Sequence, residues 1–256
     1  MLKAYDEQLR TDAETPGAVA VTRHGPLRLI TFDAGRGFIS YQDLGGADEA
    51  GIEALVAAAV AHFEADPAIE EVEWKTRGHD VAPGLHEALL RHGFEPEDPE
   101  SIMIGEAHLL AVDVPLPDGV ALRSITSAED VRAAGVMQDG VFGSPTSGGM
   151  VGEVVRRIAA GESEMWVAEA DGEIVSAGRI DPVPNTEFAG IWGGATLEEW
   201  RGRGIYRALT AARARTAIAR GKRYIHSDST EFSRPILERS GLMKVGTTTP
   251  YVRRFG

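Results

Sequence analysis

Two glycines and two arginines alternate in residues 201–204, directly before an alanine-rich segment at 205–220. Glycines let the backbone approach a ligand closely, and the first turn of a helix leaves unpaired N–H groups that carry a partial positive charge. Arg201 and Arg203 can add charge-assisted hydrogen bonds. If a helix starts at Ile205, this segment predicts a site for a phosphate or a pyrophosphate.

Other phosphate-binding motifs fit the same residues poorly. A P-loop ends in Gly-Lys-Ser/Thr, which is absent here, and a dinucleotide fingerprint needs a third glycine where Arg207 stands. An arginine-glycine segment that binds RNA is long and disordered, whereas this one lies between segments with regular patterns. The alternative without a ligand is a solvated turn.

The elements around this motif alternate between strands and helices. A boundary rich in proline and Asp-Gly lies at 114–119. After it we expect a helix pair, a hairpin around Asp171-Gly172, and then strand, helix, strand, helix and strand. The predicted strands are 121–125, two within 164–180, 187–197, 222–229 and 242–254, and the predicted helices are 126–142, 151–161, 205–220 and 232–241. This order predicts an α/β fold with a mixed sheet.

The first half contains a fainter copy of the same order. Strands are predicted at 27–32, 37–44 and 70–76, with a clear helix at 49–67 between the last two. A short helix then ends at Gly93, as a later one ends at Gly241. We therefore expect an internal duplication, with domains at 1–113 and 114–256. Chance recurrence of glycines that end helices is the alternative.

The uneven distribution of charge along the chain supports two domains and excludes one class of partner. The net charge is −13, and residues 1–112 hold 21 acidic and 8 basic residues whereas the remainder holds 18 of each. This balance argues against nucleic acid as a partner. The acidic half is either a solvated surface or a field that steers a cationic substrate. No apolar run is long enough for a membrane span, and we expect no membrane association.

Cysteine and the start of the chain bear on location and metal binding. There is no cysteine, which removes disulfides and thiolate metal sites, and no histidine pair has the spacing of a zinc site. We expect no metal. The first residues lack the apolar core of a signal peptide, so the expected location is the cytoplasm.

Residues 119–256 resemble the GCN5-related N-acetyltransferase (GNAT) superfamily. Its signature is Gln/Arg-x-x-Gly-x-Gly/Ala after the fourth strand, and here Arg201-x-x-Gly204-x-Tyr206 follows Glu-Glu-Trp. Tyr206 departs from the pattern, and we expect its side chain to point away from the pyrophosphate. The resemblance implies two tandem GNAT-like units with central mixed, largely antiparallel sheets flanked by helices. It also implies that the first unit is a degenerate copy.

The resemblance also implies where acetyl-CoA would bind. The cofactor lies in a V-shaped opening between the fourth and fifth strands, and an oxyanion donor comes from the fourth strand. Asp48 and Glu49 stand where the first copy would need a phosphate loop, so that copy is expected not to bind CoA. The implied cofactor residues are Ala195, Thr196, Leu197, Arg201, Gly202, Arg203, Gly204, Ile205, Tyr206, Arg207, Thr230 and Ser233.

Acetyl transfer needs a base for the amine and an acid for the leaving thiolate. Glu187 is the first candidate for the base, because members of the family use a glutamate on the fourth strand, and Asp228 is the second. If they are not catalytic, Glu187 is a solvated carboxylate at the end of a strand and Asp228 caps the following helix. The usual acid is a tyrosine, but Leu237 stands at its position. Tyr251 and Ser233 are the substitutes to test, with packing the alternative for Tyr251.

Together these expectations describe an acetyl-CoA-dependent N-acetyltransferase. It would transfer acetyl to a primary amine of a small molecule through a ternary complex, as a monomer or homodimer. One alternative is a catalytically weak protein that binds or senses acyl-CoA. The other is an acetyltransferase acting on protein N-termini or lysines.

Overall fold

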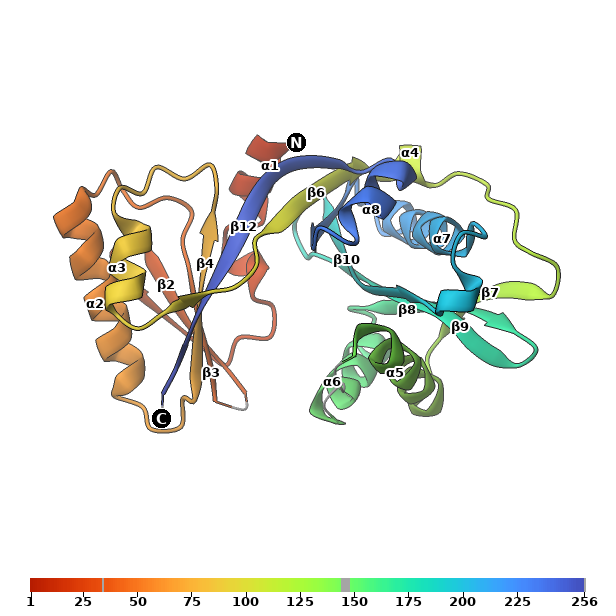
Figure 1. Cartoon of the computed structure of the whole chain (residues 1–256), viewed down its shortest axis with the longest axis horizontal. Helices are drawn as coiled ribbons and strands as arrows, with labels where there is room; N and C mark the ends of the chain where they lie inside the picture. The colour runs from red at the N-terminus through yellow and green to blue at the C-terminus, as the bar shows by residue number, and fades with distance from the viewer. Residues whose placement is uncertain (34, 144–147, 256) are drawn as a thin grey trace. The chain divides into compact units, whose positions relative to one another are not determined.

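The computed structural model of the protein describes residues 1–33, 35–143 and 148–255, and it divides into two compact units (Figure 1). Unit 1 comprises Met1–Ile102, Asp228–Arg234 and the chain from Lys244 on. Unit 2 comprises Met103–Ser227 and Pro235–Met243. The units therefore do not follow the continuous ranges 1–113 and 114–256, because the last strand completes the sheet of unit 1.

Unit 1 has five main strands in the order β1-β2-β3-β4-β12. Strands β3 and β4 are parallel, whereas the other pairs along this order are antiparallel. Helices α2 and α3 cover one face, where Phe63 of α2 lies in one core cluster with Tyr41 and Trp74. The elements are α1 (Leu2–Gln8), η1 (Asp12–Glu14), β1 (Ala20–His24), β2 (Leu27–Phe32), β3 (Arg36–Ser40), α2 (Glu49–Glu64), β4 (Glu71–Arg77), α3 (Leu85–Arg91), β5 (Glu95–Pro96) and β12 (Met243–Arg254).

Unit 2 has the strand order β11-β10-β9-β8-β7. Only the pair β10–β11 is parallel along this order. Helices α5 and α6 cover one face of the sheet and α7 covers the other (Figure 1). The elements are β6 (Glu100–Glu106), which begins in unit 1, α4 (Ala107–Leu110), β7 (Val120–Ile125), α5 (Ala128–Phe142), α6 (Gly148–Ala159), β8 (Glu164–Ala170), β9 (Glu173–Pro182), β10 (Phe188–Thr196), η2 (Glu198–Trp200), α7 (Ile205–Ala219), β11 (Tyr224–Ser229) and α8 (Arg234–Ser240).

Local sequence signals explain several of these boundaries. Ser127 caps α5 by accepting a hydrogen bond from the Asp130 amide at 3.0 Å, which is the expected role of serine before an acidic first turn. Asp171 and Gly172 turn the chain between β8 and β9 with φ of +51° and +83°, as a two-residue hairpin turn requires. The predicted α/β fold with mixed, largely antiparallel sheets flanked by helices is confirmed.

The two units repeat one arrangement. Each has antiparallel strands that lead into a parallel pair joined by a helix, which is β3-α2-β4 in unit 1 and β10-α7-β11 in unit 2. Among the described residues, no helix is both long and apolar enough to cross a membrane.

Candidate functional site

In unit 2, the parallel strands β10 and β11 separate after three residue pairs. Their pairing runs from Phe188–Tyr224 to Gly190–His226 and then ends. At the next step the Ser227 hydroxyl donates to the Ile191 carbonyl at 3.0 Å. Strand β10 continues along β9 to Thr196, with a register shift between Trp192 and Ala195. The edge of β10 therefore opens away from β11 where the cofactor opening was expected.

The loop after β10 has two glycines directly before α7, so its backbone is not covered by side chains at these two positions. Gly202 and Gly204 have φ of +73° and +82°, a region that other residues rarely adopt. Gly204 is the N-cap of α7, and no side chain caps the helix. The first amides of α7, those of Ile205, Tyr206 and Arg207, therefore point out of the helix without an intrahelical acceptor. Unpaired amides at a helix N-terminus are the kind of group that binds an anion, as the sequence predicts for this loop.

The three arginines of the loop have different surroundings. The Arg201 Nε donates to the Thr196 carbonyl at 3.1 Å, so this side chain fastens the loop to the end of β10. The Arg203 guanidinium lies over the Trp200 ring at 4.9 Å from its centroid. The Arg207 side chain is exposed. Arg203 and Arg207 are thus the arginines with guanidinium groups available to an anion.

Tyr206, which departs from the family motif, points into the protein. A Cβ on Gly194 would lie 2.6 Å from the Tyr206 hydroxyl, so the ring lies against β10. Its other neighbour is Arg213, whose guanidinium carbon lies 5.8 Å from the ring centroid. Burial lowers the pKa of Arg213, while Tyr206 opposes that shift. The tyrosine therefore packs between α7 and the sheet, and a cofactor phosphate would meet only its backbone.

The register shift in β10 was not anticipated from the sequence. Gly193 and Gly194 lie between the pairs Trp192–Arg179 and Ala195–Ala177 and have no pairing residue of their own on β9. Gly193 has a φ of +61°, and its carbonyl accepts a hydrogen bond from the Gln138 amide of α5. Two adjacent glycines in a strand pattern are the signal that indicates such a bulge.

Ala195, Thr196 and Leu197 have backbone groups that are already engaged. The Ala195 carbonyl accepts from Ser176 at 2.7 Å, and Ala195 and Thr196 both pair with β9. The Leu197 amide donates to the Val175 carbonyl at 3.0 Å. Gly193 and Gly194 are therefore better placed than these three residues to offer backbone groups to a ligand.

Aromatic rings line the start of the opening. The rings of Trp192 and His226 are 5.5 Å apart and nearly perpendicular, and Phe188 lies on the other side of His226 at 5.9 Å. A Cβ on Gly190 would approach the Trp192 indole to 2.6 Å. Gly190 therefore provides the space in which the indole lies against β10.

The two candidate bases lie at opposite ends of the parallel pair. Glu187 comes directly before β10, and its carboxylate is half-exposed and 3.9 Å from an Arg223 nitrogen. It is four residues, or about 13 Å, from Ile191 at the opening. Asp228 directly follows Ser227 at the opening, and its carboxylate is 2.5 Å from the Lys75 amine within unit 1.

The candidate acids have structural roles. Tyr251 lies in the core of unit 1, with its hydroxyl 2.8 Å from His86 Nδ1, and burial together with Glu87 raises its pKa. Ser233 lies 2.8 Å from the Ser229 hydroxyl and 3.2 Å from that of Thr230. These three hydroxyls cluster at the end of β11, in unit 1.

Leu237, at the position of the expected tyrosine, is fully enclosed. It is 2% exposed and packs in a core cluster with Ala214 and Ala217 of α7. The same cluster includes Ile191, and a leucine has no proton to donate to a leaving thiolate. In the described part of the chain, no group of three or more metal-ligating residues is found.

Unit 1 has a counterpart of the opening, but its own side chains fill it. The pairing of β3 with β4 ends at Ile39–Trp74. Beyond that point, Arg10 donates to the Tyr41 carbonyl at 3.2 and 3.1 Å and to the Asp80 carboxylate at 2.8 Å. The Glu14 carboxylate contacts both Ser40 and Arg77. These ion pairs and hydrogen bonds link the two separating strands.

The helix after this opening is also closed to anions. Asp48 caps α2, and its carboxylate accepts a hydrogen bond from the Gly51 amide at 2.8 Å. A negative charge therefore already occupies the position that Gly204 leaves bare in unit 2.

Comparisons with known proteins agree with these observations. Residues 145–241 match the model of the acetyltransferase (GNAT) family, whereas a search of curated proteins finds no match. A GCN5-related N-acetyltransferase from Kribbella flavida superposes with a TM-score of 0.72 at 17% identity, over 96% of this chain and 94% of that one. A tandem GNAT protein from the clavulanic acid biosynthesis pathway gives 0.64 at 15% identity, over 90% and 78%. A GCN5-related N-acetyltransferase from Sphaerobacter thermophilus gives 0.64 at 17% identity, over 90% and 77%.

At such identities the solved structures establish the fold alone. The chain has the GNAT fold, and its residues 145–241, which carry the loop, match the model of the GNAT acetyltransferase family.

Proposed function

We propose that the protein is an acetyl-CoA-dependent N-acetyltransferase whose cofactor site is in unit 2 and whose acceptor is a primary amine of a small molecule. The observation that carries the proposal is the bare N-terminus of α7, capped by Gly204, beside the separation of β10 from β11. Both lie in the segment that matches the family. The acceptor class rests on the family resemblance, with the acidic surface of the chain favouring a cationic amine.

In this proposal the amides at the start of α7 hold the pyrophosphate, and Arg203 and Arg207 add charge. The pantetheine arm pairs with backbone groups at Gly193 and Gly194 that do not pair with β9, although the Gly193 carbonyl already accepts a hydrogen bond from Gln138. Thr230 and Ser233, which the resemblance implies as further cofactor residues, belong to unit 1 and stay a prediction. The peptide N–H groups of the β10 bulge would polarise the thioester carbonyl, because donors aimed at a developing oxyanion are a major source of rate enhancement.

The chemistry requires a neutral amine. An alkylamine with a pKa near 10.4 must lose a proton, which costs about 4–5 kcal/mol at pH 7. Glu187 and Asp228 both stay candidates for the base: Glu187 lies at the closed end of the strand pair, and Asp228 follows Ser227 in the chain but pairs with Lys75 within unit 1. The amine then attacks the thioester carbon, and the C–S bond breaks. A CoA thiolate has a conjugate acid pKa of about 8.5, so it can leave without a strong acid.

The experiment that tests the proposal is calorimetric titration with acetyl-CoA, followed by an amine screen with detection of free CoA thiol. Arg203→Ala and Arg207→Ala are each expected to weaken acetyl-CoA binding by about tenfold. Arg239→Ala, which removes an exposed arginine of α8, is the matched control and is expected to bind normally. Failure of the wild-type protein to bind acetyl-CoA would contradict the cofactor assignment.

A second candidate function is acyl-CoA binding without efficient catalysis. The enclosed position of Leu237 favours it, because it leaves the position of the usual acid without a proton donor. Acetyl-CoA binding without turnover on polyamines, amino sugars, amino acids or basic peptides would support this candidate. Turnover confined to basic peptides would instead indicate a protein acetyltransferase.

A further inference from the structure

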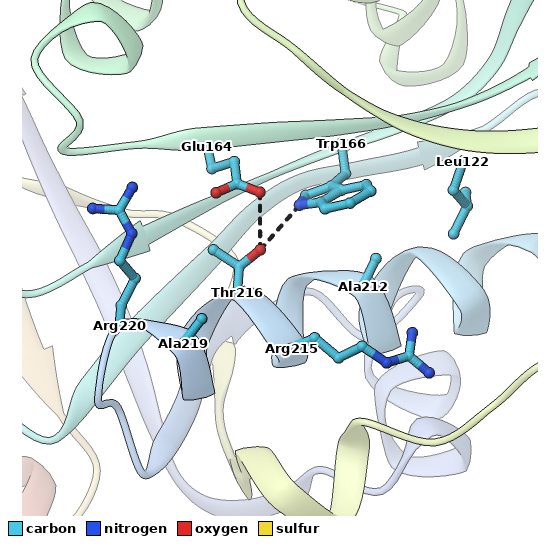
Figure 2. A pocket seen from close by; sticks show the side chains of 8 residues that line it. All are labelled: Leu122, Glu164, Trp166, Ala212, Arg215, Thr216, Ala219 and Arg220. Carbon is cyan, nitrogen blue, oxygen red and sulfur yellow. Dashed lines mark hydrogen bonds between the residues drawn. The ribbon is translucent and has the colours of Figure 1, made fainter.

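The second half of α7 and strands β7 and β8 enclose a pocket of about 460 Å³ in unit 2 (Figure 2). The indole of Trp166 lies on one side and Ala212 and Ala219 of α7 lie on the other, with Leu122 at one end. On α7 the lining begins at Ala212, eight residues after Gly204, or about 12 Å along the helix axis. The pocket is therefore separate from the glycine-arginine loop.

Thr216 fixes the polar part of this pocket. Its hydroxyl accepts a hydrogen bond from Trp166 Nε1 at 3.1 Å and donates one to the Glu164 carboxylate at 2.9 Å. Thr216 is 8% exposed, so water competes little for these bonds. The indole plane and the carboxylate are consequently held in place before any ligand arrives.

Two arginines flank the mouth of the pocket. Arg215 pairs with Asp113, which is fully exposed, and such a surface pair contributes little. Arg220 donates to the Gly161 carbonyl at 3.1 Å, and no salt bridge to it is found within the described ranges. Cations at the end of a helix also stabilise its dipole, but that effect does not require an apolar pocket between them. The lining carries one carboxylate and two guanidinium groups, so its net charge is positive.

We propose that this pocket binds a small aromatic carboxylate. The ring would lie flat against Trp166 and the alanines of α7, and the carboxylate would pair with Arg220 at the mouth, while Arg215 stays bound to the Val112 carbonyl and to Asp113. One oxygen of the Glu164 carboxylate accepts a hydrogen bond from Thr216. The negative charge of this carboxylate disfavours a second anion deep in the pocket. The ligand is therefore oriented with its own carboxylate at the mouth. A neutral or cationic ring would leave the Arg220 guanidinium without a ligand partner.

The test follows the indole N–H resonance of Trp166 in ¹⁵N-labelled protein, assigned by its loss in Trp166→Phe. The probe is 2-naphthoate. The matched probes of positive and zero charge are N,N-dimethyl-2-naphthylmethylamine, a tertiary amine that cannot be acetylated to an amide, and 2-naphthalenemethanol. Saturating acetyl-CoA is present throughout, so that the probes cannot report on the proposed cofactor site. We expect a saturable shift with 2-naphthoate and markedly weaker responses to the other two.

Variants then locate the binding. Arg220→Ala is expected to weaken 2-naphthoate binding by about tenfold, and Arg239→Ala is expected to leave it unchanged. Ala219→Phe should abolish it by filling the pocket, and it can fold because Ala219 is exposed. The proposal is overturned if 2-naphthoate gives no saturable shift at millimolar concentrations, or if the amine binds as tightly. Full affinity in Arg220→Ala or in a folded Ala219→Phe overturns it as well.

Discussion

Gly204 and Asp48 occupy the same place in the two units, directly before the helix that joins the parallel strands. Asp48 satisfies the Gly51 amide with its carboxylate, whereas Gly204 adopts a φ of +82° and leaves the amides of α7 without a side-chain cap. Asparagine and aspartate tolerate a left-handed backbone better than other non-glycine residues. Either substitution is strained at this backbone conformation, but aspartate and asparagine are strained to a similar degree, so the charge can be compared between them.

Gly204→Asp is expected to weaken acetyl-CoA binding by about tenfold or more relative to Gly204→Asn. Both side chains can cap α7 and have nearly the same shape, so the comparison isolates one negative charge beside the pyrophosphate. Titration calorimetry at low and high salt measures the difference, which should shrink as salt screens the charge. Equal affinities for the two variants would show that the pyrophosphate does not bind at this helix terminus.

Glu14 gives a prediction for the dependence of stability on pH. Burial opposes its ionisation, but Arg77, Lys75 and a hydrogen bond from Ser40 outweigh burial and hold the pKa of Glu14 below its ordinary value of 4.5. A depressed pKa stabilises the folded state above the unfolded value, and this contribution is lost as the pH falls through the folded pKa. Unit 1 should therefore lose stability below about pH 4.5.

Glu14→Gln is expected to lower the free energy of unfolding of unit 1 at pH 7 by about 3 kcal/mol, because it leaves the Arg77 guanidinium buried without its carboxylate. It should also flatten the decline of stability at acid pH. Urea denaturation at a series of pH values measures both effects. Asp12→Asn removes a mostly exposed carboxylate from the same turn, and its pH profile should follow the wild type. A Glu14→Gln profile as steep as that of the wild type would contradict the argument.

At the scale of the elements, α7 packs on the sheet through an arginine. Arg213 is 1% exposed. Its guanidinium lies against Gly178 of β9, because a Cβ added to Gly178 would be 2.8 Å from the nearest guanidinium nitrogen. Its nitrogens donate to the Leu209 carbonyl at 3.3 Å and to the Thr210 hydroxyl at 3.3 Å. Because these bonds hold the guanidinium, it cannot move aside at low cost.

Gly178→Ala should therefore destabilise unit 2 by about 1–3 kcal/mol, the usual cost of overpacking. In an Arg213→Ala background the same substitution should cost much less, because the obstructing group is gone. A double-mutant cycle by urea denaturation measures this coupling. Additive effects of the two substitutions would mean that the arginine moves aside freely, and that another contact requires the glycine.

The sequence was a good guide to elements set by local signals and a poor guide to long-range pairing. The predicted Asp171-Gly172 hairpin depends on residues close in the chain and is confirmed, and the cap that Ser127 provides to α5 is local in the same way. Strand β12 was expected to finish the second domain, but its Tyr251 pairs with Trp74 of unit 1. Nothing local in an alternating strand specifies which sheet it will join, because register and partner depend on the packed core.

The same division applies to the candidate site. The bare N-terminus of α7 could be predicted, because Gly202 and Gly204 mark the positive φ that the loop requires. The bulge at Gly193 and the contact between the Tyr206 ring and the Arg213 guanidinium could not be predicted, because both depend on how α7 packs on the sheet. An arginine in an alanine-rich helix suggests an exposed side chain, and Arg213 is the opposite.

At the scale of the whole molecule, two units of similar arrangement differ in what their openings contain. In unit 2 the strands β10 and β11 separate beside a bare helix terminus. In unit 1 the corresponding strands are linked by Arg10 and Glu14, and the helix terminus is capped by a carboxylate. Duplication of a fold therefore does not imply duplication of a site, because the site resides in particular residues.

This contrast predicts one acetyl-CoA per chain. Calorimetric titration should give a single site in the wild-type protein, and Gly204→Asp should weaken that site without revealing a second. Asp48→Gly, which removes the cap of α2, should also leave the stoichiometry at one, because Arg10 still occupies the opening of unit 1 and holds the Tyr41 carbonyl that a ligand would need. Two acetyl-CoA molecules per chain, or tight residual binding in Gly204→Asp that Asp48→Lys then strengthens, would show that unit 1 binds the cofactor.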